Sequence, residues 1–186
     1  MKTNLFKTVM GFAMVIALTV PSIAQVTYLR NIEVDNFNEI RVSLDTEVIL
    51  LKSKRNHVTL VGDSAYVFSM PIEQNNDVLS FTYNSEPENK LSRVLIEYKD
   101  IDRLVTGGTG SYYLHNVEAT KLDIFNPAAK LYISGKLHKM RLISENGTTD
   151  ISDFQSREGI LKIGETAQLV ISEKDDFITP FFESLH

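Results

Sequence analysis

Cysteine is absent from this chain of 186 residues, and its absence excludes several kinds of chemistry. Without a thiol the protein has no disulfide, no cysteine nucleophile and no thiolate metal site. A lipid anchor attached to cysteine is excluded as well, so we expect an unlipidated protein. The fold must therefore be held together by the burial of apolar surface.

Positive charge is also scarce. The sequence has 19 Lys and Arg against 24 Asp and Glu, which gives a formal net charge of −5. Its one basic cluster, at residues 52–55, is short and typical of a solvated turn. Nucleic acids and anionic lipid surfaces are bound by extended basic patches, so we expect no nucleic acid among the partners.

Apolar runs of membrane length are missing too. The run at residues 9–20 has 12 residues, whereas a membrane-spanning helix needs about 20. Lys2 and Lys7 precede this run and small residues follow it up to Ala24, a pattern that predicts a secretory signal peptide over residues 1–24. Its removal takes away two lysines and leaves 162 residues, 25–186, with a net charge of −7. We expect one soluble domain, exported to the periplasm or to the extracellular side of the cell surface.

Alternation of apolar and polar residues predicts strands through the first half of the mature chain. The alternating apolar positions are Ile40, Val42, Leu44, Val48, Leu50, Val58, Leu60, Leu79, Phe81, Tyr83, Val94, Ile96 and Tyr98. Turn-forming residues separate these segments at residues 62–63, 75–77 and 84–89. No window has the 3.6-residue period of an amphipathic helix, so we expect an essentially all-β domain.

The second half of the chain contains a repeat with a spacing of 18 to 21 residues. Three apolar columns follow this spacing: Leu104, Leu122, Met140 and Leu161; then Leu114, Ile133, Ile151 and Ile171; then Val117, Leu137 and Phe154. Such a period is typical of a β-solenoid, in which each coil buries its apolar face on its neighbours. The left-handed hexapeptide variant is excluded, because its period of six reaches Ser134 and Asn146. The expected fold class is therefore a single-domain β-solenoid similar to a parallel β-helix.

Three of the nine glycines crowd into residues 107–110. A phosphate-binding loop would need a helix directly after them, but the following residues, Tyr112 to Leu114, continue as a strand. Turn signals recur at the same place in the later repeats, at residues 126–127, 146–147 and 164. We therefore expect a tight corner of the first repeat, with Gly108 at positive φ.

The apolar spacing of the first half resembles a known family. The matching residues are Phe37-x-x-Ile40-x-Val42, Val48-x-Leu50, Val58-x-Leu60-x-Gly62-Asp63, Ile72, Leu79-x-Phe81, Leu104 and Gly108-Thr109-Gly110. This pattern is similar to the head GIN domain family of auto-transporter adhesins in Bacteroidetes-type bacteria, over most of residues 32–172. The resemblance implies an adhesin-like solenoid head and brings no catalytic residues. The chain departs from the family's Gly-Ser-Gly-type corners at residues 126–128 and 146–148.

Candidate catalytic and metal sites are weak. His115, Ser134, Ser152 and Ser172 fall on one column, but no Asp is placed to orient His115, so a hydroxyl ladder is the better interpretation. The column Asp123, Arg141 and Lys162 predicts a charge ladder on the neighbouring outward face. The four histidines are scattered and share no ligand spacing, so we expect no metal and no cofactor.

Outward residues of the repeat supply the candidate ligand-binding site. Strand parity turns Tyr113, His115, Tyr132 and Asp150 to the same outward face, with the two tyrosines on adjacent repeats. Rings beside an acid and hydroxyls are typical of a sugar-binding face, although stacked tyrosines also simply stabilise a sheet. We expect a non-enzymatic binding or structural module whose partner is a glycan or another cell-envelope component. The alternative is a β-helix enzyme acting on polysaccharide, which would need carboxylates converging on one exterior groove.

Overall fold

The computed structural model of the protein describes residues 27–82, 91–171 and 181–184. The predicted signal peptide at 1–24 and the predicted turn at 84–89 lie outside the described residues, as do Tyr83 and Ser172. Within the described part of the chain, no helix has the length and apolar character needed to cross a membrane.

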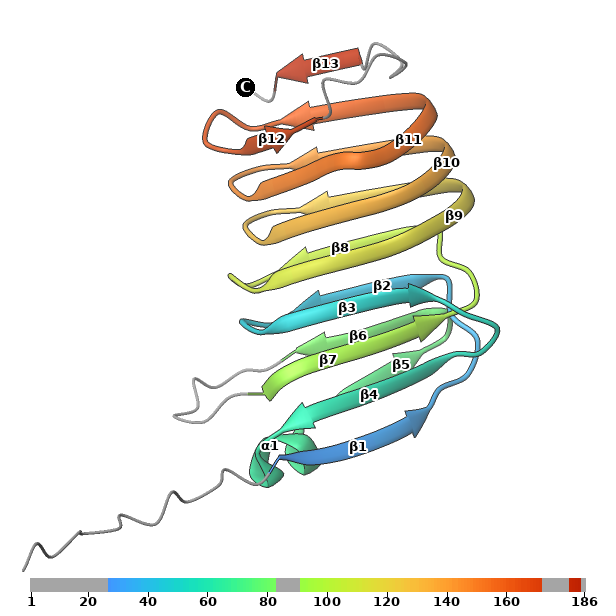
Figure 1. Ribbon diagram of the computed structural model, residues 1–186, viewed down its shortest axis with the longest axis vertical. Helices are drawn as coiled ribbons and strands as arrows, with labels where there is room; N and C mark the ends of the chain where they lie inside the picture. Colours follow the sequence, from blue (N-terminus) through green and yellow to red (C-terminus); the bar gives the residue numbers. More distant parts are fainter. Residues whose placement is uncertain (1–26, 83–90, 172–180, 185–186) are drawn as a thin grey trace, which may run out of the picture.

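The described residues form 13 strands and one short helix, so the all-β prediction is confirmed (Figure 1). The strands are β1 (Tyr28–Glu33), β2 (Glu39–Ser43), β3 (Glu47–Lys52), β4 (His57–Gly62), β5 (Ile72–Asn75), β6 (Val78–Thr82), β7 (Leu91–Tyr98), β8 (Arg103–Gly107), β9 (Ser111–Asn126), β10 (Lys130–Ser144), β11 (Thr148–Ile163), β12 (Gln168–Val170) and β13 (Phe181–Ser184). The helix, α1 (Ser64–Ser69), was not expected from the sequence. It begins where the Asp63 carboxylate accepts a hydrogen bond from the Ala65 N–H at 2.9 Å, and it is too short to show a helical period.

The strands hydrogen-bond into one sheet that curls on itself as an open half-barrel (Figure 1). The long strands β9, β10 and β11 each run through both arms of the curl. The first part of β9 pairs with β3, whereas its second part pairs with β8. The first arm is thus β1-β4-β7-β3 followed by the first parts of β9, β10 and β11 and by β12. The second arm is β5-β6-β2-β8 followed by their second parts and by β13.

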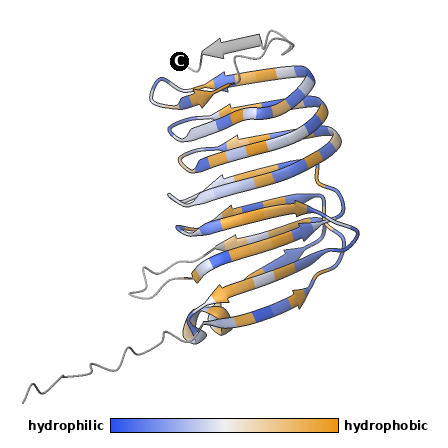
Figure 2. Ribbon diagram, in the orientation of Figure 1, coloured by the Kyte–Doolittle hydropathy of each residue, from blue (hydrophilic) through white to orange (hydrophobic). Residues whose placement is uncertain are grey.

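Pairing is parallel from β7 to β12 in the first arm and from β6 to β13 in the second. Antiparallel pairs, β1 with β4, β4 with β7, and β5 with β6, occur at the end of the stack that carries α1 (Figure 1). The apolar core lies between the two arms, and apolar and polar residues alternate along β9, β10 and β11 (Figure 2).

Tight corners join the arms along one edge of the sheet, and they bond to one another. The Gly110 N–H donates to the Leu44 carbonyl at 3.2 Å, and the Lys130 N–H donates to the Gly110 carbonyl at 3.0 Å. The prediction of a corner at residues 107–110 is confirmed, because Gly108 has a φ of 71°. A Cβ on Gly110 would collide with the Thr46 carbonyl of the corner next to it, so the stacked corners also require glycine for close approach.

The predicted columns are right for some pairs and displaced by two residues for others. Leu122 lies opposite Met140, and Leu114 lies opposite Ile133, as expected. Leu104 lies opposite Ile124 instead, and Leu161 lies opposite Leu142, so these two assignments are wrong. In the third column, Val117 and Phe154 both lie opposite Gly135, whereas Leu137 lies opposite Ala119 and Ser156. All of the predicted column residues named here are buried, because a shift of two residues leaves a side chain on the same face.

Candidate functional site

The four predicted site residues come together on the outward face of the first arm. Register places Tyr113 opposite Tyr132, and Tyr132 opposite Asp150, on three neighbouring strands. His115 lies two residues after Tyr113 on the same face of β9. A hollow of about 220 Å³ is lined by all four together with Ile133, Ser134, Ser152 and Asp153.

The aromatic rings of this face are stacked. The ring centroids of Tyr113 and Tyr132 are 4.8 Å apart and their planes differ by 7°. His115 lies nearly parallel to Tyr113, with 5.9 Å between ring centroids and 15° between planes. The Tyr–Tyr separation equals the spacing of hydrogen-bonded strands, about 4.8 Å, so the sheet itself sets the stack.

The stack ends at Tyr132. The next position along the same row of the sheet is Asp150 on β11, which has no ring. Among the described residues, ring contacts place Tyr113 against Tyr132 and no further ring against it. The hollow therefore occupies the position that a third ring of the row would fill.

Polar groups surround the hollow on the β11 side. Asp150 is half-buried, and its Oδ1 accepts a hydrogen bond from the Ser152 N–H at 2.9 Å. This bond holds the carboxylate in place and leaves Oδ2 facing no printed partner among the described residues. Ser134 accepts from the Asn116 N–H through Oγ at 3.2 Å, which fixes the oxygen while its own proton stays available. Two acids, Asp150 and Asp153, line the hollow, and its lining contains no Lys or Arg.

Two bulges shape this edge of the site. Between β9 and β10 the register shifts after Leu114, and the additional residue of β9, Asn116, has a φ of 51°. Between β10 and β11 it shifts after Tyr132, where β11 carries an additional residue. Gly135, with a φ of 122°, lies where β10 turns toward the second arm. Bulges of this kind bend strands and redirect side chains, and the sequence analysis missed them.

Comparison with known proteins adds a family to this geometry. Residues 36–126 match the family model described as "Putative auto-transporter adhesin, head GIN domain". The predicted family is confirmed. The head GIN match includes Tyr113 and His115, whereas Tyr132 and Asp150 lie beyond its end. A comparison with curated proteins gives no match.

Solved structures similar to this head GIN chain share its fold. One is a putative adhesin from Bacteroides fragilis, with 12% identity and a TM-score of 0.63, covering 74% of this chain and 76% of that chain. Another is a putative adhesin from Parabacteroides merdae, with 15% identity and a TM-score of 0.56, covering 77% of this chain and 72% of that chain. At these identities the likeness concerns the fold alone.

The catalytic and metal-binding groups considered above do not form an assembled site in the described part of this head GIN chain. His115 contacts the Tyr113 ring, and no hydrogen bond joins it to Ser134 or Ser152. Arg141 does pair with Asp123 at 3.0 Å, but Lys162 lies opposite Ile143, so the predicted three-residue ladder is wrong at Lys162. No three His, Asp or Glu of the described residues gather as a metal site.

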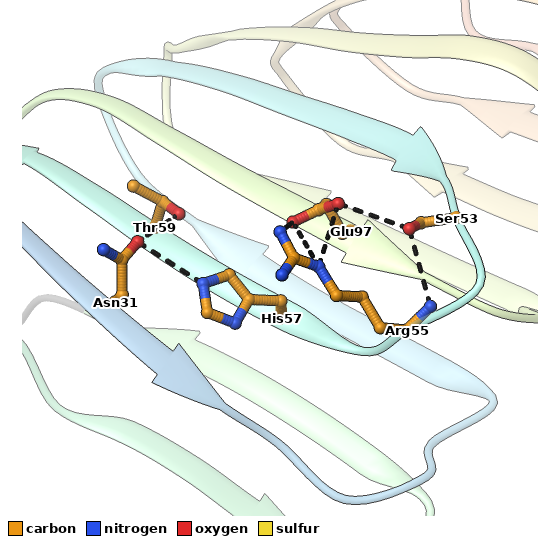
Figure 3. A network of polar contacts seen from close by, with 6 residues as sticks. All are labelled: Asn31, Ser53, Arg55, His57, Thr59 and Glu97. Carbon is orange, nitrogen blue, oxygen red and sulfur yellow. Dashed lines mark hydrogen bonds and ion pairs between the residues drawn. The ribbon is translucent and has the colours of Figure 1, made fainter.

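A second polar cluster lies on β4 and β7 and their connection from β3 (Figure 3). Arg55 donates from Nη2 to Glu97 Oε2 at 2.7 Å, and Ser53 donates to Glu97 Oε1 at 3.2 Å. The Arg55 guanidinium lowers the pKa of Glu97, and Glu97 in turn raises the pKa of Arg55. Beside it, His57 and Thr59 both contact Asn31 Oδ1 (Figure 3). These groups satisfy one another, which indicates a structural role and explains the basic segment predicted to be a solvated turn.

Proposed function

We propose that the chain is an exported, non-enzymatic carbohydrate-binding module of β-solenoid form. The hollow beside Tyr132 would hold one sugar ring. The observation that carries the proposal is a stack of two tyrosines that stops at an open position bordered by a carboxylate and two serine hydroxyls. The wider face of this module extends over the first arm of the sheet.

The chemistry of the hollow supports a sugar. The apolar face of a sugar ring packs on an aromatic ring, while its hydroxyls require donors and acceptors at the rim. Tyr132 supplies the ring, and Asp150, Ser134 and Ser152 supply the polar groups. Bound there, a sugar ring would continue the row that Tyr113 and Tyr132 begin.

Export and the solenoid form rest on separate support. The charged start, the apolar run and the small residues before Ala24 are those of a cleaved signal, and the matched family is named for adhesin heads. Parallel pairing of β9, β10 and β11, with partners 18 or 19 residues apart, is the relation that successive coils of a solenoid have.

The competing interpretation is that the tyrosines only stabilise the sheet. A stacked cross-strand pair contributes about 0.2–1 kcal/mol, and that role needs no ligand. The two interpretations differ in which property a variant loses: a binding face loses affinity, whereas a structural pair loses thermal stability.

A glycan and cell-envelope array probed with the purified mature domain tests the proposal. The double variant Tyr113→Ala/Tyr132→Ala should lose binding of the array ligands with little change in melting temperature. Phe125→Ala is the matched control, because Phe125 is a half-buried, outward aromatic on the second arm; it should keep binding. Glycans recovered after incubation should have unchanged chain length.

Loss of melting temperature with intact binding in the double variant would refute the proposed site. Shortened glycans would favour the alternative of a polysaccharide-cleaving enzyme. A wild-type domain that binds no carbohydrate on the array would refute the function itself.

A further inference from the structure

The charges around the hollow discriminate among sugars. We infer that the site prefers a sugar carrying a free, protonated amine over neutral and acidic sugars, an inference that rests on the proposed carbohydrate-binding function. The amine would lie between the Tyr132 ring and the Asp150 carboxylate. This assignment names the ligand class of the site.

The first argument is the local charge. Asp150 and Asp153 border the hollow, and its lining has neither Lys nor Arg. No ion pair of the described residues involves either acid. Lys130 points to the same face from β10, two residues before Tyr132, but it does not line the hollow. The net charge of the chain is −5, so its long-range field also attracts cations.

The second argument is the pair of aromatic rings. The face of a tyrosine ring is electron-rich and attracts a cation within about 6 Å of the ring centroid. Tyr113 covers one face of Tyr132, and the other adjoins the hollow, beside Asp150 on the next strand. An ammonium group above that face therefore meets a ring and a carboxylate together, an arrangement that a neutral hydroxyl uses less well.

The third argument is the cost of the alternatives. A uronic acid or a phosphorylated sugar would place a negative charge beside Asp150 and Asp153, where no basic side chain of the lining compensates it. An N-acetylated sugar can still stack on Tyr132, but it offers no charge to the two acids. The expected order of affinity is therefore amine, then neutral, then acidic.

Three oligosaccharides of equal length test this order: a chito-oligosaccharide, its fully de-N-acetylated form and an oligogalacturonate. Titration calorimetry is done at a pH where the amine is protonated. The de-N-acetylated form should bind about tenfold more tightly than the acetylated one, from an ion pair and a cation–π contact together. Added salt should reduce this preference.

Asp150→Asn should bring the preference for the amine to within about twofold, the residue of the cation–π contact alone. The Asn Oδ1 still accepts from the Ser152 N–H, so the loop geometry is retained. Glu145→Gln is the matched control, since it removes one negative charge from an exposed corner outside the hollow. It should leave the preference unchanged.

Equal affinity for the amine and N-acetyl forms, or tighter binding of oligogalacturonate, would overturn the inference. Binding of none of the three probes would overturn it as well. In each case the proposed function still stands or falls separately, by the array and by the Tyr113→Ala/Tyr132→Ala variant. A preference that persists in Asp150→Asn but vanishes in Glu145→Gln would assign the selectivity to another surface and also overturn the inference.

Discussion

Tyr112→Phe removes one hydroxyl from the core and should destabilise the protein. The side chain is fully buried, and its oxygen accepts a hydrogen bond from the Leu44 N–H at 3.0 Å. The same hydroxyl lies 2.5 Å from the Gly107 carbonyl and 3.0 Å from the Leu44 carbonyl, so it joins two stacked corners. Burial raises the pKa of Tyr112 to about 12, which keeps the group neutral and able to donate.

The magnitude follows from the partner that is left behind. Phenylalanine fills the same space, so no cavity forms, but the Leu44 N–H loses its acceptor. A buried donor without a partner costs about 1–3 kcal/mol. For a domain of 150–250 residues, about 2 kcal/mol lowers the melting temperature by roughly 4–8 °C.

Tyr113→Phe is the control for this experiment, because the next residue along β9 points outward and is half-buried. Removal of its hydroxyl should change the free energy of unfolding by no more than about 0.5 kcal/mol. Urea unfolding and calorimetry of both variants provide the comparison. Equal stability of Tyr112→Phe and the wild type would show that the hydroxyl does not join the corners.

Three further predictions concern glycine positions and acid stability. Gly108→Val should cost about 1–3 kcal/mol of unfolding free energy, because φ is 71° and a Cβ would lie 2.8 Å from the Leu44 carbonyl oxygen; an unchanged melting curve would contradict it. Gly135→Ala should cost about 3 kcal/mol from positive φ and a backbone collision, whereas Gly159→Ala, with open space around it, should be tolerated within about 0.5 kcal/mol. Arg55 lowers the pKa of Glu97, so its stabilising contribution is present at neutral pH and lost as the pH falls below about 4; Glu97→Gln should flatten this loss in acid unfolding, and an identical pH profile would refute the pairing.

Strand parity explains why much of the fold could be predicted from the sequence. Side chains alternate between faces with a period of two, so inward residues were identified even where the pairing partner was wrong. Leu104 is an example: its partner is Ile124, two residues from the expected Leu122, and it is still buried. The same parity brought Tyr113 and Tyr132 to one outward face and side by side.

The features that sequence reasoning missed depend on single residues. One additional residue at Asn116 shifts the register of β9, and nothing in the apolar pattern distinguishes a bulge from a bend. Lys162 was misplaced for a related reason, since the assumed spacing ignored these shifts. Helix α1 depends on the cap at Asp63 and on a single buried residue, Val67. Gly135 carried a signal, an isolated glycine within a strand pattern, that is typical of a bulge.

The outline of the hollow was also beyond the sequence. Parity placed Asp150 on the face of Tyr132, but it did not show that the ring stack ends there. That conclusion needs the register of three strands together with the ring geometry. A pattern of residue types along one chain contains neither.

The crystal structure of the mature domain with a de-N-acetylated chito-oligosaccharide tests the central claim most directly. The account predicts one sugar ring on the open face of Tyr132, with its amine within hydrogen-bonding distance of the Asp150 carboxylate. A sugar bound elsewhere on the sheet, with the hollow beside Tyr132 empty, would contradict it.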